Sequence, residues 1–303
     1  MRAIYVESLI RGPLEELWRL TQEPGLHQRW DLRFTSIEYL PRPDASRPQQ
    51  FLYSTRIGFG LKIRGRGESV GGSSGSDGER TSALRFWSDD GKSLIRKGSG
   101  YWQYVPTHDG VRFLTLYDYE VRGGSLGRLF DRAVFRRLLG WATAWSFDRL
   151  RLWIERDVDP AASMRGALIH AIVRLTLGFV WVYHGLVPKL LLHHPDEIAL
   201  LRSAGVPPEA TLMVLRALGG LEVLFGLTLL LLWRRRWPLL TTIVAMIVAG
   251  LGVALTSPAS LGAAFNPVTL NALVVALAAV GYLSSADLPS ARRCLRRKPD
   301  PAS

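Results

Sequence analysis

Four hydrophobic segments in the second half of the chain constrain its fold more than any other feature. Each is close to the roughly 20 mostly apolar residues that a helix needs to cross a membrane. Backbone polar groups have no hydrogen-bonding partner in hydrocarbon, so helices are the expected spanning form. We therefore predict an all-α bundle of four transmembrane helices within residues 164–290. The segments cover residues 168–187, 212–233, 238–255 and 267–283.

Basic residues are concentrated in alternate connections between these segments. Three arginines occupy 234–236 and five basic residues lie between 292 and 298, whereas the 256–265 connection carries no charge. The 188–211 connection mixes basic and acidic residues. Because positively charged loops stay on the cytoplasmic side, we predict a multi-pass protein with both termini in the cytoplasm. The preference for Arg over Lys, with abundant Ala, Leu and Gly, favours a GC-rich bacterium and hence a bacterial inner membrane.

Composition limits the classes of partner and site. The chain of 303 residues has a net charge of +12, a balance also found in nucleic-acid-binding proteins. Much of the basic excess flanks membrane segments, so attraction to anionic lipid explains it, and we predict no nucleic-acid partner. The one cysteine, Cys294, lies in a basic cytoplasmic tail at 291–303, which excludes an internal disulfide and a multi-cysteine metal site. Adjacent His193 and His194 lack the spacing of metal ligands, so no metal site is predicted.

The first half of the chain, residues 1–158, is predicted to be a soluble α+β domain. Apolar and polar residues alternate over 4–10, as in a strand. Apolar residues recur at helical spacing over 13–21 and over 125–157. The Gly- and Ser-rich stretch 71–78 is predicted to be a flexible hairpin tip. The remaining elements are a helical turn at 24–30 and six strands at 34–40, 50–57, 62–70, 80–88, 94–105 and 110–122.

This order, one strand, two short helices, six strands and a long helix (β-α-α-β6-α), resembles the helix-grip fold of the START-like (SRPBCC) superfamily. That superfamily contains polyketide cyclases and lipid-binding START domains. The resemblance implies a curved antiparallel sheet wrapped round the long helix, with a cavity for an apolar ligand. The motif residues are Pro13, Glu15, Trp18 and Leu20 in the first helix, and His27, Trp30 and Asp31 in the turn that follows.

Aromatic residues alternate along the predicted strand 110–122 and would line one face of the sheet. Apolar pockets with a few polar groups are typical small-molecule sites, whereas simple filling of a core is the competing explanation. We predict a small hydrophobic or lipid-like ligand. The predicted ligand-binding residues are Trp30, Phe34, Tyr53, Trp87, Tyr101, Thr115, Tyr117 and Tyr119.

No catalytic residue is predicted, and enzymatic activity stays open. His27 and His108 lie far apart, at a turn and at a hairpin, and each is expected at the surface. Four glycines lack the spacing of a phosphate loop and are expected to bend strands near a cavity mouth. These are Gly58, Gly60, Gly65 and Gly67.

The second half of the chain contains four distinctive motifs. They are, in order, WVYHGLVPKL at 181–190, EIALLRSAG at 197–205, GGLEVLFG at 219–226 and FNPVTLN at 265–271. With these motifs the sequence resembles the DoxX-like family of four-helix membrane proteins. Relatives named DoxX are associated with quinone-linked sulfur oxidation and with membrane redox complexes. The resemblance implies an alternative function as a quinone-linked oxidoreductase subunit, with quinone as cofactor and a membrane redox partner or a second copy of the chain as partner.

Glycines recur on one face of the first and second spans, and small residues let helices approach closely. This packing would place Arg174 and Glu222 inside the bundle, so we predict an ion pair between them; the alternative is that Arg174 reaches the cytoplasmic headgroups. Asn266 precedes Pro267 and is expected to cap the fourth helix. Ionisable groups at membrane depth are candidates for function. The intramembrane polar residues singled out are Arg174, His184, Lys189, Glu222, Asn266 and Asn271.

Arg128, Arg132 and Arg136 recur at every fourth position of the predicted closing helix and form a basic stripe. The stripe is either a solvated face or a contact with anionic lipid. The leading hypothesis is a membrane-anchored binding protein whose cytoplasmic domain takes up a hydrophobic ligand from or for the bilayer. Transport is disfavoured because the sequence shows neither inverted repeats nor broken helices.

Overall fold

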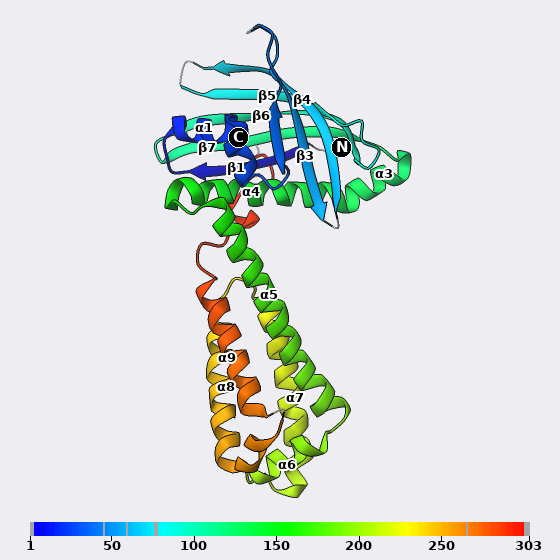
Figure 1. The fold of residues 1–303 in the computed structure, drawn as a ribbon, viewed down its shortest axis with the longest axis vertical. Helices are drawn as coiled ribbons and strands as arrows, with labels where there is room; N and C mark the ends of the chain where they lie inside the picture. The colour runs from blue at the N-terminus through cyan, green and yellow to red at the C-terminus, as the bar shows by residue number, and fades with distance from the viewer. Residues whose placement is uncertain (1–2, 45, 59, 76–77, 265, 300–303) are drawn as a thin grey trace. The chain divides into compact units, whose positions relative to one another are not determined.

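The computed structural model describes residues 3–44, 46–58, 60–75, 78–264 and 266–299, which fall into two compact units (Figure 1). The first unit joins residues 1–164 to the C-terminal residues 289–303, and the second consists of residues 165–288. The first unit mixes helices and strands, whereas the second is helical.

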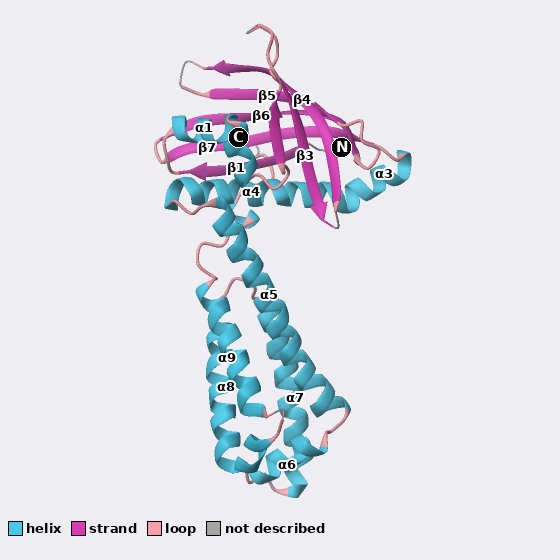
Figure 2. Ribbon diagram, in the orientation of Figure 1, coloured by secondary structure: helices cyan, strands magenta, loops and turns pink. Residues whose placement is uncertain are grey.

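The first unit contains one antiparallel sheet, drawn in magenta in Figure 2. Its seven strands have the order β1-β7-β6-β5-β4-β3-β2. Two short helices, α1 (Leu14–Gln22) and α2 (Pro24–Trp30), lie between β1 and β2 in the sequence. This order of elements confirms the predicted helix-grip fold. The strands are β1 (Ile4–Ile10), β2 (Ser36–Tyr39), β3 (Gln50–Gly58), β4 (Leu61–Ser74), β5 (Arg80–Trp87), β6 (Ile95–Thr107) and β7 (Gly110–Val121).

The closing helix contains one wide turn. Helix α3 (Gly124–Phe130) leads into a π-helical turn, η1 (Asp131–Phe135), and then into α4 (Arg136–Arg156). The turn begins at Asp131, which is fully buried and accepts a hydrogen bond of 2.6 Å from the Tyr119 hydroxyl. Tyr119 thereby fixes the first half of the closing helix to the sheet.

The core of the first unit lies between the sheet and α4. Phe113 of β7 and Phe147 of α4 stack with ring centroids 4.4 Å apart, and both are fully buried. Nearby, the Tyr117 hydroxyl and Thr143 Oγ1 lie 2.8 Å apart and hydrogen-bond. The odd-numbered residues of β7 from 111 to 119 are all buried, so the alternation in the sequence correctly identified the inner face of the sheet.

Several element boundaries differ from the prediction, and two of these differences have a local cause. Strand β4 continues past residue 70 to Ser74, because after a bulge its last residues pair with the start of β5. Gly71 at this bulge has a φ of 132°, which side-chain-bearing residues rarely adopt. Residues 76–77 of the predicted hairpin tip lie outside the described residues. Helix α5 begins at Pro160, before the first predicted span at 168–187; proline at a first helical position has a φ already suited to the helix.

The C-terminal segment covers the edge of the sheet at β1. Leu295 and Glu7 exchange two backbone hydrogen bonds of 2.9 Å. The Ser290 N–H and the Arg293 guanidinium donate to Asp148 of α4 at 2.7 and 3.0 Å. Unpaired edge strands invite association with other chains. The segment predicted as a separate basic tail therefore protects β1 over its described part, and its residues 300–303 lie outside the described residues.

The second unit is a helical bundle, as predicted. Within the described part of the chain, three stretches are long and apolar enough to cross a membrane, and the fourth predicted span is an apolar helix of 17 residues. The first of the long stretches, Pro160–Leu191, ends in a π-helical segment. The elements are α5 (Pro160–His184), η2 (Gly185–Leu191), α6 (Pro195–Ser203), α7 (Pro208–Leu231), α8 (Trp237–Thr256), η3 (Pro258–Gly262) and α9 (Pro267–Leu283).

The first and second spans meet at glycines, as their spacing predicts. A Cβ atom added to Gly219 would lie 2.8 Å from the Gly185 carbonyl oxygen. One added to Gly226 would lie 2.9 Å from the Gly178 carbonyl oxygen. These distances leave no room for a side chain, so the two backbones touch. The buried apolar core beside this crossing consists of Val173, Leu177, Leu229, Leu239 and Ala278.

Candidate functional site

Aromatic rings cover the inner face of the sheet at β3, β4 and β5. On β3, Tyr53 pairs with Gly65 of β4, and the Tyr53 ring occupies the space that a side chain on Gly65 would fill. Because the glycines have no Cβ, each ring can lie flat across the neighbouring strand. Phe51 lies over Gly67 and Phe86 over Gly98 in the same way.

We call Phe34, Phe51, Tyr53 and Phe86 the aromatic wall. The rings of Phe34 and Tyr53 meet edge to face, with centroids 5.6 Å apart. All four residues are only partly buried, in contrast to the fully buried Trp30, Phe113 and Phe147. The inner face is therefore closed beneath α4 and partly open at the aromatic wall.

A buried ionic cluster lies at one end of this wall. Asp31 is 1% exposed and accepts hydrogen bonds from Arg33, at 2.9 Å from Nε and 2.6 Å from Nη2. His27 Nε2 lies 3.0 Å from Asp31 Oδ2, the oxygen that accepts from Arg33 Nη2. The Arg33 guanidinium lies over the rings of Tyr117 and Phe34, 5.5 and 5.7 Å from their centroids. Such cation–π contacts strengthen when water is excluded.

Burial sets the protonation of this cluster. Burial lowers the pKa of His27, although the Asp31 carboxylate acts in the opposite direction. Burial alone would raise the pKa of Asp31, but the Arg33 guanidinium and His27 hold it below its usual range. Burial also raises the pKa of the Tyr117 hydroxyl. At neutral pH the cluster therefore pairs one carboxylate with one guanidinium, beside an uncharged imidazole and phenol.

Four of the predicted ligand-binding residues are buried on the inner side of the sheet. Trp30 belongs to the core, where its indole N–H donates to the Leu20 carbonyl at 2.9 Å. Thr115, Tyr117 and Tyr119 point inward from β7, and each hydroxyl has a hydrogen-bonding partner within the domain. Only Phe34 and Tyr53 among the predicted residues belong to the partly open wall.

Trp87 and Tyr101 lie on the opposite face of the sheet from the predicted interior. Tyr101 pairs with Leu116, an outward position of β7, and its neighbour Trp102 pairs with the inward Thr115. Likewise Phe86, not Trp87, faces inward on β5. Which residues of a strand face inward depends on its pairing register, and the sequence of that strand alone does not determine the register.

The prediction that His27 lies at the surface is wrong, whereas His108 is exposed as expected. His27 is 9% exposed and its ring stacks on Trp30, with centroids 5.0 Å apart. Arg33 and the ionic role of Asp31 were not predicted. The sequence pattern that indicates this cluster is the spacing of His27, Asp31 and Arg33, because His27 and Asp31 are one helical turn apart at the end of α2.

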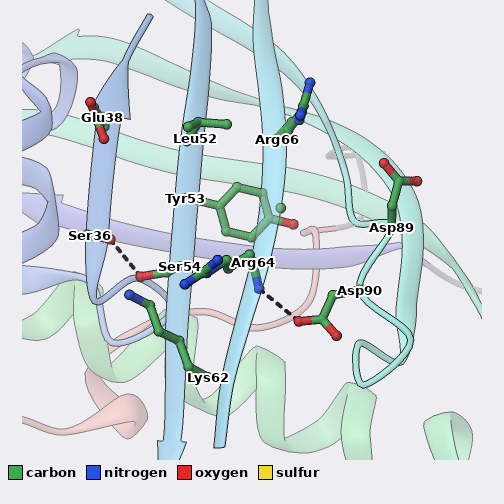
Figure 3. Close-up of a pocket in the computed structure, with 11 residues that line it drawn as sticks. Ser36, Glu38, Leu52, Tyr53, Ser54, Lys62, Arg64, Arg66, Asp89 and Asp90 are labelled. Carbon is green, nitrogen blue, oxygen red and sulfur yellow. Dashed lines mark hydrogen bonds between the residues drawn. The ribbon is translucent and has the colours of Figure 1, made fainter.

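A groove of about 540 Å³ is visible on the first unit (Figure 3). Most of its lining residues belong to the outer face of β2, β3 and β4, and Tyr53 is the one predicted ligand-binding residue among those described. Its charged lining does not suit an apolar ligand. The charged residues are Glu38, Lys62, Arg64, Arg66, Asp89 and Asp90.

In the second unit the predicted ion pair between Arg174 and Glu222 is wrong. Arg174 is fully buried and donates to the Leu229 carbonyl at 3.1 Å and to the Arg235 carbonyl, both near the end of α7. Glu222 instead pairs with Lys189, with Nζ and Oε2 3.1 Å apart. Lys189 also lies 3.2 Å from Glu197 Oε1, so one ammonium contacts two carboxylates.

The other intramembrane polar residues lie at helix ends or at a contact between helices. Asn266 caps α9 as predicted, with its side chain accepting from the Thr269 N–H at 2.9 Å. Asn271 lies against Gly250 of α8. The His184 side chain is exposed at the end of α5, and its carbonyl oxygen lies 3.4 Å from Lys189 Nζ. Phe265, which begins the last motif, lies outside the described residues.

Comparison with known proteins identifies similar chains for both halves. Residues 178–279 match the DoxX-like family. An uncharacterized membrane protein of Bacillus subtilis, YndG, is 42% identical over 298 residues, which cover 98% of each chain. Among solved structures, TTHA0849 from Thermus thermophilus is 18% identical with a TM-score of 0.37, covering 50% of this chain and 99% of that one. A STAR-related lipid transfer protein from Xanthomonas axonopodis is 16% identical with a TM-score of 0.38, covering 50% and 84%.

Proposed function

Because the chain belongs to the family of the B. subtilis membrane protein YndG and carries a DoxX-like membrane domain, we propose that it is a membrane-anchored binding protein. Its helix-grip domain takes up a small hydrophobic or lipid-like ligand. The membrane domain keeps this domain at the bilayer surface, where an apolar ligand is concentrated, so the effective concentration of the site is raised without further contacts.

One observation carries the proposal: Arg33 lies against aromatic rings at the edge of a partly open apolar wall. Small-molecule sites are mostly apolar, with a few placed polar groups that orient the ligand. Burying the Arg33 guanidinium costs free energy, because a buried guanidinium needs both a counter-ion and hydrogen-bond acceptors. Asp31 supplies the counter-ion and holds the side chain in one orientation.

The chemistry of the site indicates an elongated apolar ligand with one acidic or strongly polar group. A guanidinium has five N–H donors, and Asp31 accepts from only the Nε and Nη2 nitrogens of Arg33. Tyr117 also hydrogen-bonds to Arg33, and a carboxylate or phenol on the ligand would accept from the donors that Asp31 and Tyr117 leave. The apolar part would lie along Phe34, Tyr53 and Phe86.

The distribution of basic residues supports an orientation with both termini in the cytoplasm of a bacterium and the spans in its inner membrane. In this orientation the site takes its ligand from the cytoplasmic leaflet or delivers it there.

Photo-crosslinking tests the position of the site. The full-length protein in mild detergent is incubated with a fatty acid that carries a diazirine in its chain, irradiated and digested, and the labelled peptides are identified by mass spectrometry. We expect labels at residues of the aromatic wall, in β3, in β5 and at Phe34, and competition by unlabelled fatty acid. Labelling confined to the outer groove or to the membrane helices would contradict the proposal.

A second candidate function rests on the cluster of Lys189, Glu197 and Glu222. With all three groups ionised, the cluster has a net charge of −1 at the edge of an apolar bundle, and ionisable groups in such places often serve in proton relays. A quinone-linked membrane subunit would need such a group. In this case Glu222→Gln would abolish oxidation of decylubiquinol by membranes that contain the protein, while leaving its folding intact.

A further inference from the structure

The closing helix of the first unit exposes a row of large apolar side chains. The row runs along α3, η1 and the start of α4, where a soluble domain would normally show polar residues. We call these residues the outer stripe. They are Leu126 (78% exposed), Leu129 (64%), Phe130 (52%), Val134 (49%), Leu138 (56%) and Trp141 (43%).

Polar contacts on the inward side of the same helix hold it in its present rotation. Asp131 is fully buried and accepts from Tyr119, and Arg136 Nε lies 3.0 Å from its other oxygen. Further along, Thr143 hydrogen-bonds to Tyr117. The helix cannot turn its apolar stripe inward without breaking these contacts. The stripe is therefore a fixed external surface.

The charge around the outer stripe is positive. Residues 124–142 contain four arginines and a single acidic residue, Asp131. Asp131 is buried and paired with Arg136, which also contacts Asp118 at 2.8 Å. Arg136 therefore does not belong to the exposed basic stripe that the sequence predicts. The exposed arginines are the predicted Arg128 and Arg132, together with Arg137.

We propose that the outer stripe is a membrane-docking surface that lies in the headgroup region of an anionic bilayer. Helices with a Leu-, Phe- and Trp-containing face flanked by Arg lie in the plane of the interface, with the apolar face buried about 5–10 Å into the boundary between headgroups and acyl chains. Anionic lipid attracts the flanking arginines. The membrane domain already anchors the chain, so a weak docking surface suffices. This inference is independent of the proposed ligand site.

Spin labelling tests the docking surface in the full-length protein. Leu129→Cys and Leu138→Cys place labels on the outer stripe, and Ile57→Cys, at an exposed position of β3 (55%), is the matched control. The native Cys294 is buried, and burial raises the pKa of its thiol to about 12, so it stays unlabelled. Collision rates with oxygen and with a water-soluble nickel chelate are measured in detergent and in nanodiscs of phosphatidylglycerol.

In the anionic nanodiscs we expect labels at 129 and 138 to gain oxygen collisions and to lose at least half of their nickel collisions. The label at 57 should remain accessible to nickel. Replacing Arg128, Arg132 and Arg137 with Gln should reduce the change in anionic nanodiscs. Nickel accessibility that is equal at all three positions would overturn the proposal. So would dipolar broadening at 129 and 138 that disappears on dilution with unlabelled protein, because the stripe would then pair with a second copy.

Discussion

Lys189 lies against Glu222 where the first and second spans cross, and Gly219 makes this contact geometrically feasible. A Cβ atom on Gly219 would lie 2.9 Å from the Lys189 Cβ atom, closer than side chains approach one another. The absence of that atom lets Lys189 lie over α7 and reach the Glu222 carboxylate at 3.1 Å. Gly219 therefore affects both the packing and the electrostatics of this crossing.

Gly219→Ala should destabilise the second unit by about 1–3 kcal/mol, the usual cost of overpacking. The added methyl group would meet the Gly185 carbonyl and the Lys189 side chain. Gly220→Ala is the matched control, since no atom lies within 4 Å of its added Cβ. Thermal unfolding of both variants in mild detergent measures the difference. Equal midpoints for the two variants would show that the spans do not cross here.

Lys189→Met should be more destabilising than Glu222→Gln. Removing the ammonium leaves two carboxylates without their cation, and breaking a buried pair costs about 3–5 kcal/mol, less here because Glu197 and Glu222 keep some exposure. Glu222→Gln leaves Lys189 paired with Glu197. The double variant should recover part of the loss, which a double-mutant cycle in detergent measures. Strictly additive effects would contradict the contact.

His27 should make the first unit less stable in mild acid. Burial lowers the pKa of folded His27, so as pH falls below about 6.5 the unfolded chain binds this proton first and unfolding becomes easier. His27→Gln should flatten the dependence of the urea midpoint on pH between about 6.5 and 5, and exposed His108→Gln should leave it unchanged. A slope that persists in His27→Gln would assign the effect to another group.

Leu295→Pro should weaken the first unit by about 1 kcal/mol, the typical contribution of one hydrogen bond. Proline removes the N–H that donates to the Glu7 carbonyl at 2.9 Å. Leu295→Ala keeps that N–H and, because the Leu295 side chain is exposed, serves as the control. Amide hydrogen exchange in β1 measures the result: exchange should accelerate in the proline variant only.

The sequence was sufficient for those features that depend on local periodicity. Alternation along β7 identified its inner face, and glycine spacing identified the crossing of two spans. The ion pair was assigned wrongly because glycine spacing places Arg174 and Glu222 inside the bundle without specifying their partners. Arg174 donates to backbone carbonyls near the end of α7, and Glu222 pairs with Lys189 of η2.

The misplaced aromatic residues show a second limit. Trp87 and Tyr101 each lie next to the residue that faces inward, Phe86 and Trp102. A shift of one residue reverses the face of a strand, and the register follows from pairing with distant strands. The ionic cluster was missed for a related reason: Arg33 and Tyr117 are far apart in the sequence and come into contact only in the folded domain.

The most direct test of the account is to identify small molecules that co-purify with the full-length protein in mild detergent. Tyr53→Glu places a charge on the aromatic wall, whereas Leu52→Glu places the same charge on the opposite face of β3. Extraction and mass spectrometry should find a stoichiometric apolar molecule with an acidic or polar group in the wild type and in Leu52→Glu, and about tenfold less in Tyr53→Glu, since an unpaired charge in an apolar site costs more than the 1.4 kcal/mol that this factor represents. No bound molecule in the wild type, or equal amounts in both variants, would contradict ligand binding by the helix-grip domain.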